Sequence, residues 1–367
     1  MVMRFDSPAP ASPLQPRPAV AEGKRYAIPP KQDFIDLPLG NTERVVISQA
    51  EKEIFEEIVS QLDVSAIAQY PKLSGLQKLL AERLGVMPER VLVTAGADEA
   101  LERAIGSVLG SGRELIATSP TFEMIPIYAR LTGGSVQQVP WLEGAFPADG
   151  VLDAVTDDTT VISVVTPSNP TGAVVPLADL QRIALAVPHI LLLVDLAYVE
   201  FADVDITANL LDLANVVIVR SLSKAWGMPG VRVGYAVGDA EVISWMSRTS
   251  GPYSVSGPSL AIAEARVRRG DESVREYVRR VRAERKNLAA LIAEFGGMPM
   301  PSQANFVLAR FENAAGVSDD LAARGIGTRR FPDNPDLKDA LRITCPGDEH
   351  AFGRLTNALR AALDPKA

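Results

Sequence analysis

The strongest constraint on the fold of this chain is a series of short, continuously apolar segments, each followed by small and polar residues. These segments cover residues 90–94, 114–118, 161–165, 190–195 and 216–219. Uninterrupted runs of Val, Ile and Leu indicate strands that are buried on both faces, as in a parallel sheet. Helical spacing predicts intervening helices, which cover residues 98–109, 122–131 and 177–186. The pattern therefore predicts an α/β fold with a mostly parallel central sheet flanked by helices.

The alternation of apolar strands and helices stops near residue 259, which indicates a second, smaller domain. With 367 residues, the chain fits one large domain and one smaller one better than a single core. One long helix is predicted over residues 260–295, and we interpret its arginines, among them Arg282 and Arg285, as a solvated face. Short segments over residues 304–310 and 340–344 and a terminal helix follow, which predicts an α+β arrangement. We divide the chain into a Pro-rich N-terminal arm (1–44), a large α/β domain (45–258) and a small α+β domain (259–367).

Net charge and the scarcity of metal ligands exclude several classes of function. The chain has 37 Lys and Arg against 45 Asp and Glu, a net charge of −8, so nucleic acid and anionic membranes are not expected as partners. Cys345 is the single cysteine, and His189 and His350 are the only histidines, so we expect no disulfide framework and no metal site. No secretory signal or membrane-spanning apolar stretch is visible, which favours a cytoplasmic protein.

Polar residues at the ends of the predicted strands are the candidates for a functional site, since ligands bind there in open α/β sheets. After the first strand, Gly96 permits a tight turn, and Ala97 and Asp98 begin a helix whose free N–H groups could bind a phosphate. The same residues also fit an ordinary turn between a strand and a helix. They do not form a G-x-G-x-x-G pattern, so a dinucleotide site is not supported.

Three later strand ends carry Asn169, Asp195 and Lys224, and each residue taken alone has a simpler interpretation. Asn-Pro dipeptides often begin turns, Asp often caps a helix, and a lysine is usually a surface charge. Together, however, they recur at the ends of successive strands, 26 and 29 residues apart. The set supplies an acid for a ring nitrogen, a donor for a ring oxygen and an amine for an aldehyde. Nearby hydroxyls and an arginine could bind a phosphate, so the combination indicates pyridoxal 5′-phosphate (PLP).

Ordered motifs extend this combination over much of the chain. SNPTG lies at residues 168–172, DLAY at 195–198 and SLSKAWGMPGVRVG at 221–234, with SQANFVLARF at 302–311. In these motifs the chain resembles the fold-type-I PLP-dependent aminotransferases of class I and II, and within them the histidinol-phosphate aminotransferase branch. The resemblance runs from about residue 70 to residue 344.

The resemblance implies roles for the residues that match. Lys224 would bind PLP as a Schiff base and move a proton, Asp195 would keep the ring nitrogen protonated, and Tyr198 would complete the catalytic set. Asn169 and Tyr198 would hydrogen-bond the ring oxygen, and Phe122, where the family usually has tyrosine, would stack on the ring. The implied phosphate ligands are Ala97, Asp98, Ser221, Ser223, Arg232 and, from the neighbouring subunit of a homodimer, Tyr70.

The implied substrate ligands leave the amino donor open. Arg342 would bind the α-carboxylate with Asn169 beside it, and Arg329 would contact the distal group. The branch usually carries an N-E-N-P-like segment followed by a tyrosine, and residues 37–43 lack it. Leu196 also stands where an acidic residue is usual.

We therefore expect an aminotransferase that moves an amino group from an amino acid, or from an amino-alcohol phosphate such as histidinol phosphate, to a 2-oxo acid. A PLP-dependent decarboxylase, lyase or cyclase on the same scaffold is the alternative, because these motifs bind the cofactor without choosing the bond that breaks. A non-catalytic regulator with this fold is a third interpretation, against which the presence of Asp195, Lys224 and Arg342 argues.

Overall fold

A seven-stranded sheet forms the centre of the larger part of the molecule in the computed structural model, which describes residues 16–21 and 33–363. Most of the predicted arm, residues 1–15 and 22–32, lies outside the described residues. The strand order is β2-β8-β7-β6-β5-β3-β4, and only β8 runs antiparallel to its neighbours. The strands are β2 (Val91–Thr94), β3 (Glu114–Ser119), β4 (Ser135–Pro140), β5 (Thr159–Val165), β6 (Leu191–Asp195), β7 (Val216–Ser221) and β8 (Gly234–Gly238).

All five predicted strands are confirmed, and two strands were missed. β4 contains two glutamines and forms one edge of the sheet, so it lacks the apolar signal. β8 is a short segment that begins and ends with glycine, which resembles a loop in sequence. Because β8 is antiparallel, it requires no crossover helix between it and β7.

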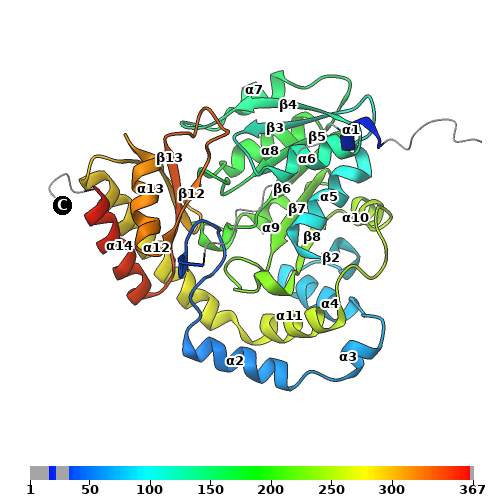
Figure 1. Ribbon diagram of the computed structural model, residues 1–367. Helices are drawn as coiled ribbons and strands as arrows, with labels where there is room; N and C mark the ends of the chain where they lie inside the picture. Colours follow the sequence, from blue (N-terminus) through cyan, green and yellow to red (C-terminus); the bar gives the residue numbers. More distant parts are fainter. Residues whose placement is uncertain (1–15, 22–32, 364–367) are drawn as a thin grey trace, which may run out of the picture.

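Helices cover both faces of this sheet (Figure 1). Alternate residues of β6 enter different cores: Leu191 and Leu193 pack in one cluster, and Leu192 and Val194 pack in the other. Each fully buried side chain of this size stabilises the fold by about 1.5–3 kcal/mol. The described helices of this part are α2 (Gln49–Ser60), α3 (Ser65–Ala68), α4 (Ser74–Leu84), α5 (Gly96–Val108), α6 (Met124–Leu131), α7 (Ala148–Asp153), α8 (Leu177–Ala186), α9 (Thr207–Leu210) and α10 (Ala240–Ser247), with α1 (Pro18–Ala21) beside α6.

The C-terminal part contains a four-stranded antiparallel sheet in the order β12-β13-β10-β9. Two of its strands match the predicted segments, and the chain ends in the predicted terminal helix. The elements are β9 (Met298–Pro299), β10 (Phe306–Arg310), β11 (Ile326–Gly327), β12 (Arg329–Arg330), β13 (Ala340–Thr344), α11 (Gly257–Arg269), α12 (Asp271–Glu294), α13 (Ala314–Ala323) and α14 (Glu349–Leu363).

The single helix predicted over residues 260–295 is wrong, because the chain breaks into α11 and α12 at Gly270. A Cβ atom at Gly270 would lie 2.6 Å from the carbonyl oxygen of Arg266, so only glycine fits there. Asp271 then begins α12, where its negative charge complements the helix N-terminus.

The end of the predicted arm packs against the C-terminal part of the chain. β1 (Leu37–Pro38) pairs in parallel with β11, and both Leu37 and Leu39 are buried. The alternation of these two leucines is the sequence signal for this strand, and the Pro-rich context conceals it. No helix among residues 16–21 and 33–363 has the length and apolar character needed to cross a membrane.

A close approach between β8 and the first turn of α5 predicts the effect of one substitution. A Cβ atom at Gly234 would lie 2.5 Å from the backbone nitrogen of Ala97, and that backbone has no room to move. We expect Gly234→Ala to lower the free energy of unfolding by at least about 2 kcal/mol in urea titrations. Gly106→Ala is the matched control, because Gly106 lies inside α5 facing open space, and it should stabilise the protein by about 0.5–1 kcal/mol. Equal effects at the two sites would contradict the packing argument.

Candidate active site

The carboxyl ends of β5, β6 and β7 lie side by side and bring three predicted site residues to one edge of the sheet. Val165 pairs with Asp195, and Asp195 pairs with Val219, so the loops that follow these strands are neighbours. Asn169 lies in the loop after β5, and Lys224 lies three residues beyond the end of β7. The parallel pairing therefore gathers groups that are 26 and 29 residues apart in the sequence.

The Lys224 amine and the Tyr198 hydroxyl meet at a residue that the sequence analysis missed. Nζ of Lys224 donates a hydrogen bond to Oγ1 of Thr42 at 2.6 Å. The same Oγ1 lies 2.7 Å from the hydroxyl of Tyr198, and both residues are buried. Tyr198 packs edge-on against Phe306, with ring centroids 5.5 Å apart. Thr42 belongs to residues 37–43, which the sequence analysis considered only because they lack the N-E-N-P-like segment. No signal in the sequence identified Thr42 itself.

Asp195 is a buried carboxyl at the end of β6. Its Oδ1 accepts a hydrogen bond of 2.9 Å from the N–H of Ala197, and the side chain is almost wholly inaccessible to solvent. Burial raises the pKa of Asp195 to about 7, although the Ala197 N–H and the positive charge of Lys224 act in the opposite direction. A cationic partner in this position would therefore gain an unusually strong interaction. The residue that follows, Leu196, is also fully buried, which explains how an apolar side chain fits there.

Arg342 on β13 faces the same region from the C-terminal sheet. Its Nη1 donates to Oδ1 of Asn169 at 2.6 Å, and its Nη2 donates to the carbonyl oxygen of Gly40 at 2.9 Å. The guanidinium carbon lies 5.2 Å from the ring centroid of Phe306 and 5.9 Å from that of Phe331. The arrangement places a buried cation beside Asn169, as the carboxylate-binding role requires.

Hydrogen-bond donors surround the first turn of α5, where the phosphate site was predicted. Nη1 of Arg232 lies 3.5 Å from Oγ of Ser223, and Oγ of Ser221 accepts from the N–H of Ser223 at 3.1 Å. Gly96 has φ of +80°, and a Cβ atom there would lie 2.6 Å from Nη2 of Arg232. The positive φ therefore favours glycine at this turn, which also leaves room for the guanidinium beside the helix N-terminus.

The donor set fits PLP. Two hydroxyls, an arginine and the free N–H groups of Ala97 and Asp98 would hold its phosphate. The buried carboxyl of Asp195 suits a protonated ring nitrogen, and the Lys224 amine suits the aldehyde.

Comparison with known proteins decides the family. The model of the family "Aminotransferase class I and II" matches residues 36–359. The chain is a class I and II aminotransferase. It is 36% identical over 293 residues to a histidinol-phosphate aminotransferase of Ruegeria pomeroyi, covering 77% of this chain and 79% of that protein. It is also 34% identical over 305 residues to an aromatic amino acid aminotransferase of Mycobacteroides abscessus, covering 81% and 86%.

Solved structures support the fold of this aminotransferase. The histidinol-phosphate aminotransferase of Sinorhizobium meliloti in complex with PLP superimposes with a TM-score of 0.80 at 23% identity, covering 91% of this chain and 92% of that one. The predicted fold is therefore confirmed. Class I and II aminotransferases use PLP, so the predicted cofactor and the predicted transamination are confirmed as well, and the decarboxylase, lyase or cyclase alternative is not favoured.

The remaining predicted residues of the aminotransferase lie in different surroundings. Phe122 is half-buried and packs against the core just before α6. Nη2 of Arg329 lies 3.7 Å from Oε1 of Glu123, and Nη2 of Arg232 lies 3.0 Å from a carboxylate oxygen of Asp98. The structure thus gives both arginines acidic partners that the sequence analysis did not predict.

Tyr70 lies on the surface of the single chain. Its ring stacks on that of Tyr253, with centroids 4.6 Å apart, and 76% of the residue is exposed. Its predicted contact with the phosphate site of a neighbouring subunit stays a prediction.

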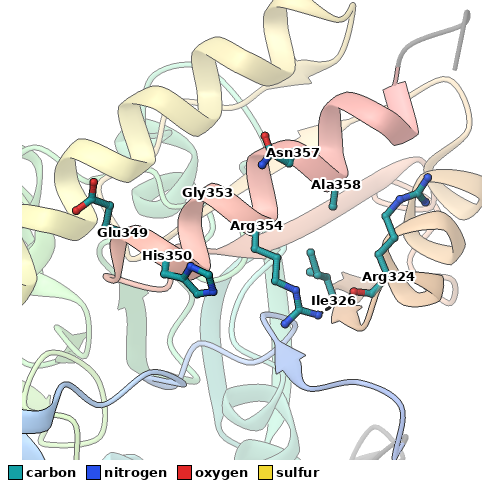
Figure 2. Close-up of a pocket in the computed structure, with 8 residues that line it drawn as sticks. All are labelled: Arg324, Ile326, Glu349, His350, Gly353, Arg354, Asn357 and Ala358. Carbon is teal, nitrogen blue, oxygen red and sulfur yellow. Dashed lines mark hydrogen bonds between the residues drawn. The ribbon is translucent and has the colours of Figure 1, made fainter.

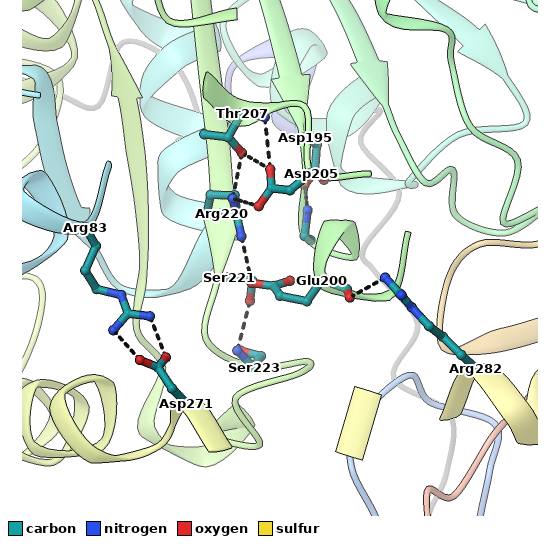
Figure 3. A network of polar contacts seen from close by, with 11 residues as sticks. Arg83, Asp195, Glu200, Asp205, Thr207, Arg220, Ser221, Ser223, Asp271 and Arg282 are labelled. Atoms are coloured by element: carbon teal, nitrogen blue, oxygen red, sulfur yellow. Dashed lines mark hydrogen bonds and ion pairs between the residues drawn. The ribbon is translucent and has the colours of Figure 1, made fainter. Parts of the chain in front are cut away.

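A polar network supports the turn that follows Tyr198 (Figure 3). Arg220, on β7, donates to Glu200 at 2.9 Å and to Asp205 at 3.1 Å. Arg282 of α12 donates to the carbonyl oxygens of Glu200 and Phe201, and Arg285 to that of Phe201. The interpretation of Arg282 and Arg285 as a solvated face is therefore wrong, because main-chain acceptors of the turn satisfy their guanidinium groups.

A separate cavity of about 620 Å³ lies beside α14 and β11 (Figure 2) and contains none of the predicted site residues. Arg354 in its wall pairs with Asp36 at 2.6 Å and also donates to the carbonyl oxygen of Arg324. Within the described part of the chain, no group of three or more His, Cys, Asp or Glu residues could hold a metal ion.

The pKa of Asp195 predicts a pH-dependent cost of folding in the cofactor-free protein. Its pKa rises from 3.8 to about 7 on folding, so the native state binds the additional proton between these values. The stability contributed by this group is therefore highest near pH 4 and falls as the pH rises to about 7, by at most about 1.4 kcal/mol per pH unit. We expect Asp195→Asn to lack this dependence, so its stability relative to the native protein should increase across that range in urea titrations. Burial also raises the pKa of Glu284 to about 7. Its effect on stability cancels in the comparison, because both proteins contain Glu284. A difference that is constant with pH would contradict the prediction.

Proposed function

We propose that Lys224, Asp195 and Tyr198 form the catalytic set of this aminotransferase. When bound, PLP supplies an electron-withdrawing ring that stabilises negative charge on the α-carbon of the amino donor. The Lys224 amine attaches the cofactor and, once released, moves the proton at that carbon. Asp195 holds the positive ring nitrogen, and Asn169 and Tyr198 donate to the ring oxygen. The observation that carries this proposal is the buried Asp195 carboxyl at the end of β6, beside the strand that leads to Lys224.

The remaining predicted ligands complete the cofactor site. Phe122 stacks on the ring, while Ser221, Ser223 and Arg232 bind the phosphate together with the N–H groups of Ala97 and Asp98. The position of these groups around the first turn of α5 supports the assignment, because helix N-termini and hydroxyls both favour an anion. Arg232 contacts the Asp98 carboxylate and the Ser223 hydroxyl at once, so its half-exposed guanidinium lies beside the proposed phosphate site.

The donor substrate is an amino acid or an amino-alcohol phosphate such as histidinol phosphate, and the acceptor is a 2-oxo acid. Arg342 binds the α-carboxylate beside Asn169, supported by its burial between the rings of Phe306 and Phe331. Arg329 contacts the distal group. It is the pairing partner of Arg342 across β12 and β13, so the two side chains leave the sheet on the same face.

We also propose a cytoplasmic homodimer, with no nucleic acid or membrane partner, in which Tyr70 reaches the neighbouring phosphate site. Val64, Ile67 and Tyr70 are each about three-quarters exposed, and Tyr253 is half exposed (74%, 75%, 76% and 52%). Such a group of large apolar side chains near one end of α11 favours burial against a second copy. The domain boundaries at residues 44 and 258 belong to the same proposal.

Spectroscopy of the half-reaction tests the reaction and the substrate. The visible absorbance of the PLP-loaded enzyme is recorded while single amino donors, including histidinol phosphate and aromatic amino acids, are added. We expect one class of donor to shift the absorbance, and a 2-oxo acid to reverse the shift. Release of carbon dioxide or ammonia without a reversible shift would contradict transamination. Lys224→Ala should slow the half-reaction at least about 100-fold, because proton transfer by a positioned group contributes about 10²–10⁴-fold.

Removal of the predicted carboxylate ligand should weaken substrate binding selectively. We expect Arg342→Ala to raise KM for the amino acid about 10–100-fold, since a hydrogen bond to a charged group contributes about 1.5–3 kcal/mol. Arg330→Ala is the control, because Arg330 is the neighbouring exposed arginine on β12 and lies 4.0 Å from Asp319. Equal KM values for the two variants would contradict the assignment of Arg342.

Sedimentation of charge-introducing variants tests the dimer. We expect Ile67→Asp to shift the enzyme toward the monomer and to weaken PLP binding, because the neighbouring Tyr70 is then lost. Val204→Asp is the control, since Val204 is similarly exposed (66%) but lies in a different loop, and it should remain dimeric. A native protein that sediments as a monomer at micromolar concentration would contradict the proposal.

A further inference from the structure

The carbonyl groups of a short segment before α2 are all bonded to the C-terminal part of the chain. Its residues, 39–42, are called the strap here. All four carbonyl oxygens of the strap accept hydrogen bonds of 2.7–3.0 Å, and every donor lies beyond residue 300. The donors are, in order, the N–H of Thr344, Nη2 of Arg342, Oγ1 of Thr344 and Nδ2 of Asn305. A backbone whose four carbonyl groups are all bonded has restricted freedom, which favours a defined position for the Thr42 side chain.

The position of the Thr42 hydroxyl is between two members of the catalytic set. Its oxygen accepts from Nζ of Lys224 at 2.6 Å and lies 2.7 Å from the Tyr198 hydroxyl. The oxygen has two lone pairs and one proton, so it can accept from the amine and also share a hydrogen bond with the Tyr198 hydroxyl, in which either oxygen can donate. Thr42 and Tyr198 are only 5% and 4% exposed, so water does not readily replace these contacts. A charge-assisted bond in such surroundings is stronger than one at the surface.

This contact requires a Lys224 amine that carries no covalent partner. If Lys224 holds the cofactor as proposed, the amino group of the donor would replace it on the cofactor and leave a free lysine amine, and the geometry applies to that stage. We propose that Thr42 is a positioning residue that holds the released Lys224 amine against the Tyr198 hydroxyl. The inference rests on the proposed roles of Lys224 and Tyr198.

The strap also connects this position to substrate binding. Arg342 donates to Gly40, two residues before Thr42, with the same guanidinium that is proposed to bind the substrate carboxylate. A carboxylate that moves Arg342 therefore acts on the segment that carries the Thr42 hydroxyl. Substrate capture and the placement of the released amine are thus joined through two residues of backbone.

Chemical labelling of the cofactor-free protein tests the contact without relying on activity. Trinitrobenzenesulfonate reacts with neutral amines, and mass spectrometry measures its addition to Lys224 separately from the exposed Lys52. Loss of the hydroxyl removes the partner that holds the amine in place, so Thr42→Val should label Lys224 about 10-fold faster at pH 8. Thr42→Ser keeps the hydroxyl and should label within about threefold of the native rate. Lys52 should react equally in all variants.

A matched control separates the contact from general damage. The Thr207 hydroxyl is buried and accepts from Arg220 at 2.7 Å, so Thr207→Val also removes a hydroxyl bound to a cation. We expect Thr207→Val to leave Lys224 labelling at the native rate. If Thr42→Val also labels at the native rate, or Thr207→Val accelerates labelling equally, the proposal is wrong. If Thr42→Val does not fold, Thr42→Ala replaces it. A Thr42→Ala variant that is folded by circular dichroism and labels Lys224 at the native rate would also show that the proposal is wrong.

The half-reaction of the loaded enzyme gives a second readout. Thr42→Val should lower the rate constant about 10–100-fold with little change in the donor concentration for half-saturation, and Thr42→Ser should restore the rate. Native protein that shows no reversible half-reaction with any donor would overturn the proposed function itself. Native protein that reacts, beside a Thr42→Val variant with an unchanged rate, would overturn only the inference about Thr42.

Discussion

The buried carboxyl of Asp195 is the constraint on which the rest of the site depends. An acid at the end of an apolar strand loses its hydration, and one backbone N–H does not compensate for that loss, as its raised pKa shows. The site therefore favours a cationic ring nitrogen strongly. The Lys224 amine and the Tyr198 hydroxyl lie near the same strand ends, which is consistent with the proposal that one rigid cofactor contacts all of these groups.

Two sets of long-range contacts link that cofactor region with the C-terminal sheet and helices. The strap is held by β13 and Asn305 and places a hydroxyl on Lys224. Arg282 and Arg285 of α12 hold the turn after Tyr198 from another direction. Both sets use main-chain oxygens as acceptors, so they fix backbone as well as side chains. The catalytic groups of the large sheet are therefore positioned partly by residues that follow them by 80 or more positions in the chain.

The sequence was sufficient for the parts of the molecule whose signal is local. Continuous apolar runs identified β5, β6 and β7, and their order placed Asn169, Asp195 and Lys224 at one edge. It was insufficient where the determining contact is distant. Thr42 and Lys224 are separated by 182 residues, and no local pattern distinguishes Thr42 from any other threonine. β8 and the break at Gly270 were missed for a different reason. Glycine is required at these positions because neighbouring backbone lies too close for a Cβ atom, and this proximity is not visible in the sequence.

Net charge alone also concealed how the cations of the site are arranged. The chain carries a net charge of −8, yet four cations, Lys224, Arg232, Arg329 and Arg342, are proposed for the same ligand region. Two of the cations involved already contact carboxylates, Arg232 with Asp98 and Arg329 with Glu123, and in both pairs the acid is about half exposed. Such pairs are weak in water, so a ligand phosphate or carboxylate that brings more charge and more hydrogen bonds displaces them at little cost. A net negative charge is therefore compatible with a local site for small anions, if these arginines bind the ligand as proposed.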